Sequence, residues 1–350
     1  MDEAGFLEIV KGTRRGPTAE AMRIALALAS VPYRAGVSLR NQAFNRGWKT
    51  IHHADVPIVS VGNLTLGGTG KTPMVEWVSR RLRERLLRVA ILSRGYGGEE
   101  GLNDEGRVLE ENLPDVPHLQ GRDRVALART AVEELESQVL VLDDGFQHRR
   151  LARDLDIVLL DALEPFGLGR MFPRGLLREP IGSLRRAGIV VLSRADLVSS
   201  ETRQSIRIEA ERRAGPLRWV EARHAPAALI EGTGRFEPLA NLIGPRVAAF
   251  CGIGNPDGFR KTLEAMGVSL AGFRTFPDHH PYTASDVAEI ARWGEMMGAD
   301  LVLTTQKDSV KLRTSTIGRM PLRALRIGLE VLEGESLLGE ALSRLIPPSA

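Results

Sequence analysis

A glycine-rich stretch at residues 67–72 constrains the fold of this chain more than any other feature. The run Gly67-Gly-Thr-Gly-Lys-Thr72 follows an apolar run at 57–62 and precedes apolar residues at 74, 75, 77, 78 and 82, which have helical spacing. A strand, a glycine turn and a helix in this order let backbone N–H groups close around an anion at the helix N-terminus. The pattern therefore predicts a phosphate-binding loop on an α/β sheet.

The side chains of this loop suit the polyphosphate of a nucleotide. Lys71 can hold the β- and γ-phosphates, and the Thr72 hydroxyl can reach Mg²⁺. Thr65 occupies the first glycine position of the common G-x-x-x-x-G-K-[ST] pattern, so the variant G-G-x-G-K-T fits better. We therefore expect ATP and Mg²⁺ as cofactors. The expected ATP contacts are Thr65, Leu66, Gly67, Gly68, Thr69, Gly70, Lys71 and Thr72.

Two adjacent aspartates supply the expected partner motif of the loop. Val139-Leu-Val-Leu-Asp143-Asp144 is an apolar strand that ends in carboxylates, and P-loop proteins place such a carboxylate near Mg²⁺. Either aspartate could face the metal. The predicted metal-binding residues are Thr72, Asp143 and Asp144.

Nearly continuous apolar runs indicate the fold class. The runs at 89–93, 139–142, 157–160 and 189–192 predict buried strands of a P-loop NTPase-like parallel sheet covered by helices. Further along, 247–251 and 301–304 predict strands, and 257–266 and 284–297 predict helices, of a smaller C-terminal α/β domain. The expected division is an N-terminal segment 1–54, a P-loop core 55–215, a linker 216–245 rich in Gly, Pro and polar residues, and a second domain 246–350.

The N-terminal segment is basic and amphipathic. Residues 21–54 contain no Asp or Glu, and the apolar run 24–31 is far shorter than the ~20 residues that span a bilayer. Such a segment can lie on an anionic membrane surface, and a helix packed on the domain with a solvated basic face fits the composition equally well. No small-residue cleavage site follows, so we expect no signal peptide. The cations are Arg23, Arg34, Arg40, Arg46 and Lys49.

Several other residues that could carry chemistry leave alternatives open. The single cysteine, Cys251, lies in an apolar run and is expected to be a buried structural thiol. The pair His279-His280 lacks a third ligand at a recognised spacing, so we expect no zinc site, although a His near a carboxylate could tune a general base. Ser193-Arg-Ala-Asp196 stands where GTPases read guanine, which keeps GTP binding open.

Arginines in the loop 172–180 could hold phosphate by bidentate contacts. From spacing alone, a surface salt bridge between Arg178 and Glu179 is the favoured interpretation. His148 follows the two aspartates closely and is therefore expected near the nucleotide edge of the sheet.

A series of motifs between about residues 55 and 312 is similar to one known family. The motifs are Val61-Gly-Asn-Leu-Thr-Leu-Gly-Gly-Thr-Gly-Lys-Thr-Pro73, Ser93-Arg-Gly-Tyr-Gly-Gly98, Asp143-Asp-Gly-Phe-Gln-His148, Leu151-Ala-Arg-Asp154, Phe166-Gly167, Leu177-Arg-Glu-Pro180, Cys251-Gly-Ile-Gly-Asn-Pro256, Asp278-His-His-Pro-Tyr282 and Thr304-Thr-Gln-Lys-Asp308. In content and order they resemble the tetraacyldisaccharide 4′-kinases, the lipid A 4′-kinases of outer-membrane biogenesis.

The resemblance implies transfer of the ATP γ-phosphate to the 4′-hydroxyl of a tetraacyl glucosamine disaccharide 1-phosphate, by a peripheral enzyme at the cytoplasmic face of the inner membrane. The family's general base maps to Asp104 in Asn103-Asp-Glu-Gly106, with Asp123 as the alternative, and its partner maps to His279. Together with Lys71, Asp104 and His279 are the expected catalytic residues. The expected substrate or phosphate contacts are Asn63, Arg94, Gln147, His148, Arg178 and Glu179.

Two other functions compete with this interpretation. One is a membrane-associated GTPase or ATPase switch, for which Ser193–Asp196 and the glycine loop are the best support. The other is a soluble small-molecule P-loop kinase of related fold. The expected partners are the acylated disaccharide 1-phosphate and the inner-membrane surface, with no nucleic acid and no obligate protein partner. We expect the second domain to bring His279 to the active site and to exclude water as it closes.

Overall fold

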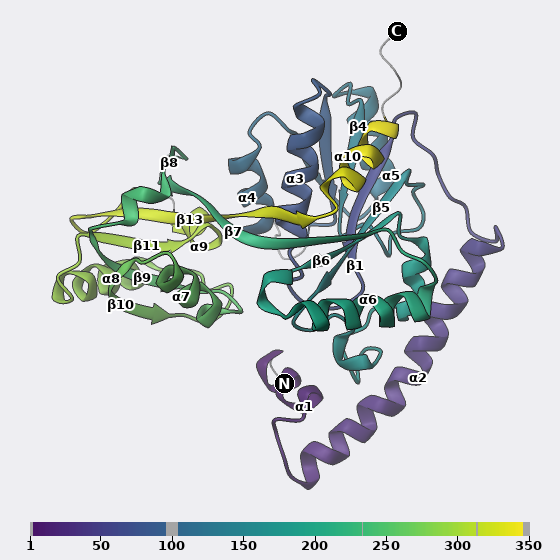
Figure 1. The fold of residues 1–350 in the computed structure, drawn as a ribbon, viewed down its shortest axis with the longest axis horizontal. Coiled ribbons are helices and arrows are strands. Elements are labelled where there is room, and N and C mark those ends of the chain that lie inside the picture. Colours follow the sequence, from purple (N-terminus) through teal and green to yellow (C-terminus); the bar gives the residue numbers. More distant parts are fainter. Residues whose placement is uncertain (1–2, 96–103, 233, 313, 346–350) are drawn as a thin grey trace. The chain divides into compact units, whose positions relative to one another are not determined.

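A computed structural model of the chain describes residues 3–95, 104–232, 234–312 and 314–345 (Figure 1). The chain forms two compact units. Unit 1 comprises Met1–Arg94, Asp115–Arg223 and Leu329–Ala350, and unit 2 comprises Gly95–Pro114 and His224–Gly328. Two long strands, β7 (Trp219–Glu231) and β13 (Met320–Glu333), each begin in one unit and end in the other.

Unit 1 is built on a parallel sheet of order β7-β6-β5-β1-β4-β2-β3. Every residue of β1, β2, β4 and β6 is buried, as expected for a parallel sheet covered on both faces. The strands predicted at 57–62, 89–93, 139–142, 157–160 and 189–192 are confirmed. Their bounds are β1 (Ile58–Asn63), β2 (Val89–Ser93), β4 (Val139–Asp143), β5 (Leu155–Asp161) and β6 (Ile189–Ser193), and the sheet also contains β3 (His118–Gln120), which the sequence did not predict.

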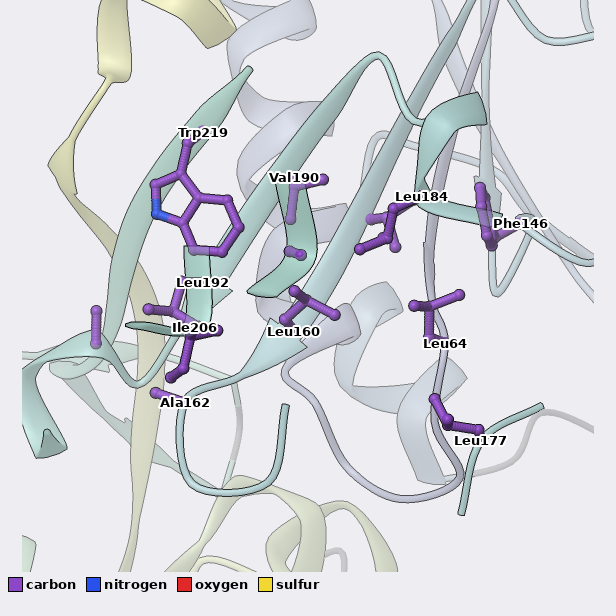
Figure 2. Close-up of a cluster of buried hydrophobic side chains, with 13 residues drawn as sticks. Leu64, Phe146, Leu160, Ala162, Leu177, Leu184, Val190, Leu192, Ile206 and Trp219 are labelled. Carbon is purple, nitrogen blue, oxygen red and sulfur yellow. The ribbon is translucent and has the colours of Figure 1, made fainter. Parts of the chain in front are cut away.

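Helices pack apolar side chains on this sheet. One buried cluster joins β5 and β6 to Leu184, Ile206 and Trp219, and Figure 2 shows these side chains lying together. A second cluster joins Ala128 and Ala131 to β1, β2 and β4. The helical elements of unit 1 beyond its N-terminal segment are α3 (Lys71–Arg83), α5 (Arg124–Glu133), η1 (Gly167–Gly169), η2 (Ile181–Arg186), η3 (Ala195–Leu197), α6 (Ser200–Ala214) and α10 (Glu335–Arg344).

Unit 2 has a smaller sheet of order β10-β9-β11-β13-β7, in which β10, β9, β11 and β13 pair in parallel. Its predicted strands and helices are confirmed, and the helices start at side-chain caps: Asn255 accepts a hydrogen bond from the Gly258 N–H, and Thr283 forms a capping box with Asp286. The elements are α4 (Asp104–Asn112), β8 (Phe236–Glu237), η4 (Leu239–Leu242), β9 (Arg246–Cys251), α7 (Pro256–Ala265), β10 (Ser269–Thr275), α8 (Ala284–Met296), β11 (Leu301–Thr305), α9 (Gln306–Leu312) and β12 (Thr316–Ile317).

The division differs from the expected one in three places. Residues 216–245 contain a strand, β7, instead of a linker. The fully buried residues of β7 lie near its two ends, and its half-buried middle, which contains Pro226, hides the apolar pattern of a strand. Residues 104–114 group with unit 2, since α4 packs against α9. The C-terminal residues from Leu329 return to unit 1, where Arg81 pairs with Glu335 of α10.

The N-terminal segment forms two helices, α1 (Glu3–Lys11) and α2 (Pro17–Asn45). Along one face of α2, Ile24, Leu28, Val31 and Leu39 are each more than half exposed. The same helix is fixed to the rest of unit 1, because the Tyr33 hydroxyl donates to the Arg178 carbonyl at 3.2 Å and the Tyr33 ring packs on Phe172. Within the described ranges, no helix combines the length and apolar character needed to cross a membrane.

Candidate functional site

The glycine loop lies between β1 and the first turn of α3. Gly67 has φ 108° and Gly70 has φ 86°, a left-handed conformation that favours glycine. Among the described residues, no heavy atom lies within 4 Å of where a Cβ on Gly67 or Gly68 would stand, so the backbone borders open space. Gly70 precedes Lys71 at the helix start and offers no capping side chain. The first N–H groups of α3 are thus available to an anion.

Contacts from neighbouring strands hold this loop in place. The Ser193 hydroxyl donates to the Thr69 carbonyl at 2.8 Å, and the Arg194 guanidinium donates to the Gly68 carbonyl at 3.0 Å. Arg194 also pairs with Asp161 at the end of β5. Ser193 and Arg194, which suggested a guanine-reading tetrad in the sequence, therefore support the phosphate loop itself.

Asp144 connects the loop to the strand-end aspartates. Its Oδ1 lies 3.8 Å from the Lys71 ammonium, and Arg178 Nη1 donates to Oδ1 at 2.8 Å and to Oδ2 at 3.0 Å. Burial raises the pKa of this carboxyl, but Lys71 and Arg178 outweigh the effect and the net pKa is lowered. Asp144 is therefore a carboxylate near neutral pH. Asp143, the last residue of β4, is buried beside it.

Asn63, which is completely buried at the end of β1, connects three of the predicted contacts. Its amide donates to the Thr69 hydroxyl at 3.0 Å, its carbonyl Oδ1 accepts from Arg178 at 3.3 Å, and its backbone carbonyl accepts from the Gln147 side chain at 2.9 Å. The structure thus brings Asn63, Thr69, Gln147 and Arg178 into one hydrogen-bonded group. Arg94, by contrast, lies exposed just after β2.

Arg178 and Glu179 do not form the surface salt bridge that their spacing favours. Arg178 pairs with Asp144, whereas the Glu179 side chain is 0% exposed and accepts from Asn41 at 2.9 Å, from Arg186 at 3.0 Å and from Arg40 at 3.3 Å. The two neighbouring side chains therefore have different partners, one just after β4 and the others in α2 and η2. Glu179 can act on a ligand only through these partners.

A basic cavity of about 460 Å³ lies where the C-terminal end of α2 meets the loop after β4. Four of its nine lining residues are Arg or Lys, and none of the nine is acidic. Gln147 Oε1 and His148 Nε2 are buried there without a hydrogen bond from the described residues. Burial and the charges of Arg124, Arg150 and Arg153 lower the pKa of His148 to about 4. The lining residues are Arg40, Phe44, Lys49, Thr50, His52, Gln147, His148, Arg149 and Arg150.

Unit 2 contains a second group of predicted site residues. Asp104 begins α4, and its Oδ2 lies 3.1 Å from His279 Nδ1. The His279 backbone has φ 57° and donates to the Gly252 carbonyl at 3.2 Å and to Asp278 Oδ1 at 3.0 Å, which fixes the turn. Asn103 and the segment Tyr96–Gly98 of the family motifs lie outside the described residues.

The alternative base, Asp123, caps a helix instead. Its carboxylate accepts from the backbone N–H groups of Val125 and Ala126 at the start of α5, and these bonds lower its pKa. Cys251 is fully buried, as predicted, and burial together with the charge of Asp308 raises its pKa to about 12. No group of three or more His, Cys, Asp and Glu side chains arranged for a metal occurs among the described residues.

Two residues that complete these groups were not singled out from the sequence. Arg124, almost completely buried, donates to the Asp144 carbonyl at 2.9 Å, and Lys311 of α9 approaches Asp104 at 3.4 Å. Arg124 follows Asp123, the alternative general base, so the sequence did contain a basic residue next to a candidate site residue. Nothing local in the sequence marked Lys311.

Comparisons with known proteins agree with these arrangements. The family model described as tetraacyldisaccharide-1-P 4′-kinase matches residues 22–346. A tetraacyldisaccharide 4′-kinase of Anaeromyxobacter dehalogenans (strain 2CP-C) is 44% identical over 94% of this chain and 92% of its own length. One of Geobacter sulfurreducens is 36% identical over 95% and 97%.

Among solved structures, the "apo" form of LpxK from Aquifex aeolicus in complex with ATP superposes with a TM-score of 0.74 and 29% identity, covering 93% of this chain and 100% of that one. The resemblance drawn from the motifs is confirmed at the level of the whole chain and of the fold. This chain belongs to the tetraacyldisaccharide 4′-kinase family.

Proposed function

We propose that this protein transfers the γ-phosphate of ATP to the 4′-hydroxyl of a tetraacyl glucosamine disaccharide 1-phosphate, in lipid A biosynthesis. Family membership supports the reaction, and the ATP complex of the Aquifex aeolicus relative supports the nucleotide. The single observation of this structure that carries the proposal is the open glycine loop with Lys71 held 3.8 Å from Asp144.

The nucleotide would lie with its polyphosphate on residues 65–72. The N–H groups at the start of α3 and the Lys71 ammonium would neutralise the β- and γ-phosphates. Arg178, which donates to Asp144, would contact the transferred group. Thr72, Asp143 and Asp144 offer the oxygen ligands that Mg²⁺ prefers alongside phosphate oxygens. When bound, the metal would supply further charge neutralisation; these three residues would hold it.

Asp104 would act as the general base. The acceptor hydroxyl oxygen forms a bond to the γ-phosphorus, the bond from that phosphorus to the β-γ bridging oxygen breaks, and ADP leaves with the electron pair. The hydroxyl proton passes to the Asp104 carboxylate, which His279 holds from 3.1 Å. Most of the acceleration in such transfers comes from positioning and charge neutralisation.

The basic cavity of unit 1 would bind the 1-phosphate of the acceptor. Four cationic side chains and no acidic one line it, and Gln147 and His148 each present a buried polar atom that receives no hydrogen bond from the part of the chain that the structure describes. The exposed apolar face of α2, with Ile24, Leu28, Val31 and Leu39, adjoins cationic residues such as Arg34. An amphipathic basic helix of this kind binds the interface of an anionic membrane. The helix supports peripheral membrane contact, and we propose, from the family resemblance, that the enzyme acts at the cytoplasmic face of the inner membrane.

A direct assay tests the proposal. The protein is incubated with [γ-³²P]ATP, Mg²⁺ and the acylated disaccharide 1-phosphate in mixed micelles, and mono- and diphosphorylated lipids are separated. Labelled diphosphorylated lipid should form with ATP, and Lys71→Met should lower its formation by about 10²–10³-fold because a donor to the transferring phosphate is lost. Absence of labelled lipid, or release of the label as inorganic phosphate only, would refute the proposed reaction.

A further inference from the structure

Lys311 lies between two carboxylates of unit 2. Its ammonium is 3.4 Å from Asp104 Oδ2 and 3.4 Å from Asp308 Oδ1, and its side chain is only 10% exposed. It extends from α9, the helix against which α4 packs. A single ammonium therefore joins the first residue of α4 to the interior of unit 2.

The more deeply buried of the two carboxylates, that of Asp308, is held by several hydrogen bonds. Asp308 is 0% exposed, and its Oδ2 accepts from the Gly252 N–H at 3.0 Å and from the Thr305 hydroxyl at 2.7 Å. A Cβ on Gly252 would stand 3.0 Å from the Pro277 carbonyl oxygen and 3.2 Å from Asp308 Oδ1, so glycine permits the close approach. With Oδ2 engaged, Oδ1 faces Lys311. A buried carboxylate of this kind needs its cation.

The more exposed carboxylate, that of Asp104, is held through one of its two oxygens. Both Lys311 Nζ and His279 Nδ1 approach Oδ2 of Asp104, at 3.4 Å and 3.1 Å. His279 is 65% exposed and can turn in solvent, whereas Lys311 is enclosed by the protein. The contacts that Asp104 receives from the described residues all end on Oδ2, which leaves Oδ1 for a hydroxyl group.

A neighbouring ion pair provides a comparison in the same two helices. Lys307 of α9 lies 3.1 Å from Glu105 of α4, but these side chains are 42% and 41% exposed. Exposed pairs of this kind contribute little to positioning, because solvent screens the charges and holding two long side chains in one geometry costs entropy. Lys307 thus differs from Lys311 in burial and in its acidic partner, not in its place on the fold.

We propose that Lys311 is a positioning residue for phosphate transfer: anchored by Asp308, it holds the Asp104 carboxylate in the orientation that accepts the acceptor's hydroxyl proton. The proposal rests on the function proposed above, in which Asp104 is the base. In the proposed role, Lys311 contacts neither the nucleotide nor the acceptor and acts only through Asp104. Its removal should therefore change turnover and leave ATP binding alone.

The test compares four variants with the wild type in the kinase assay: Lys311→Met, Lys307→Met, Asp104→Asn and the double variant Asp104→Asn/Lys311→Met. Lys311→Met keeps the length of the side chain but removes the charge. Loss of orientation at a reacting group costs about 10²-fold, so kcat should fall by about that factor while KM for ATP stays within about twofold. Lys307→Met should match the wild type.

The double variant separates action through Asp104 from a general effect on structure. Residues that work as one unit are not additive, so adding Lys311→Met to Asp104→Asn should cause no further loss. A further loss of about 10²-fold in the double variant, or a Lys311→Met enzyme with wild-type kcat, would overturn the proposal. Wild-type turnover by Asp104→Asn would instead refute Asp104 as the base, which identifies the proposed function as the part that failed.

Lys311→Met leaves the buried Asp308 without its cation and could prevent folding. Circular dichroism checks this, and Asp308→Asn/Lys311→Met, which removes both charges, then replaces the single variant. The same two outcomes decide the matter: reduced kcat with unchanged KM for ATP supports the positioning role, and wild-type kcat overturns it.

Discussion

Glu179→Ala should destabilise unit 1 far more than the loss of an ordinary surface carboxylate. Glu179 is completely buried, and its oxygens accept from Asn41 and Arg40 of α2 and from Arg186 of η2. Arg186 is 16% exposed and lies over the Phe146 ring at 4.3 Å, so after the substitution its charge would remain buried without the carboxylate. The residue thus joins the N-terminal helix to the core of unit 1.

The magnitude follows from the burial of each partner. Breaking a buried ion pair by removing one member costs about 3–5 kcal/mol. Arg40 is 36% exposed, so solvent weakens its ion pair with Glu179. We therefore expect a loss of unfolding free energy at the lower end of this range, about 3 kcal/mol. With a guanidinium m-value of about 4 kcal/mol per M for a unit of this size, the unfolding midpoint should fall by about 0.75 M.

Guanidinium unfolding followed by tryptophan fluorescence measures this shift. A Trp293→Phe background leaves Trp48, Trp77 and Trp219, all in unit 1, as reporters. Glu209→Ala is the matched control, since Glu209 also pairs with two arginines but on the exposed surface of α6. Its midpoint should not move measurably. Equal midpoints for the Glu179→Ala and Glu209→Ala proteins would refute the reasoning from burial.

Three further predictions follow from the same structure. The pKa of His148 is lowered to about 4 by burial and nearby arginines, so its contribution to stability is present above pH 6.5 and is lost as pH falls from 6.5 to 4. Discounted for partial exposure, this loss of unfolding free energy is about 1–2 kcal/mol. Guanidinium unfolding midpoints measured between pH 6.5 and 4 should show it, and the midpoints of His148→Gln should depend less on pH. Cys251, with its pKa raised to about 12, should resist alkylation at pH 8 until the protein unfolds, and rapid labelling of native protein would contradict this. Leu28→Glu/Val31→Glu on the exposed face of α2 should weaken cosedimentation with anionic vesicles by about tenfold or more, whereas Leu86→Glu, on another exposed leucine of unit 1, should not.

The parts of the site that were predictable from sequence are those whose determinants are close together in the chain. The glycines before Lys71 need only the strand before them and the helix after them, and Asp143 and Asp144 need only the apolar strand that they end. Buried parallel strands read as continuous apolar runs, which is why β1, β2, β4, β5 and β6 were predicted close to their observed bounds.

The rest depends on contacts between distant segments, which leave no local pattern. Lys311 gains its importance from Asp104, a residue on another helix far away in the sequence. Glu179 resembles a surface residue in sequence, because its three polar partners come from two helical elements that meet only in the fold. For β7, burial depends on which strands pair with each end of it, so its interrupted apolar pattern resembled a linker.

The position of the new phosphate on the lipid distinguishes transfer to the 4′-hydroxyl from every other phosphate transfer. The lipid product of a reaction with ATP is isolated and examined by ³¹P–¹H correlation NMR. A second phosphomonoester coupled to the proton on carbon 4′ of the distal glucosamine is the predicted result. A product phosphorylated at any other carbon, or an acceptor recovered unchanged while ADP accumulates, would show that the protein is not a 4′-kinase of this lipid.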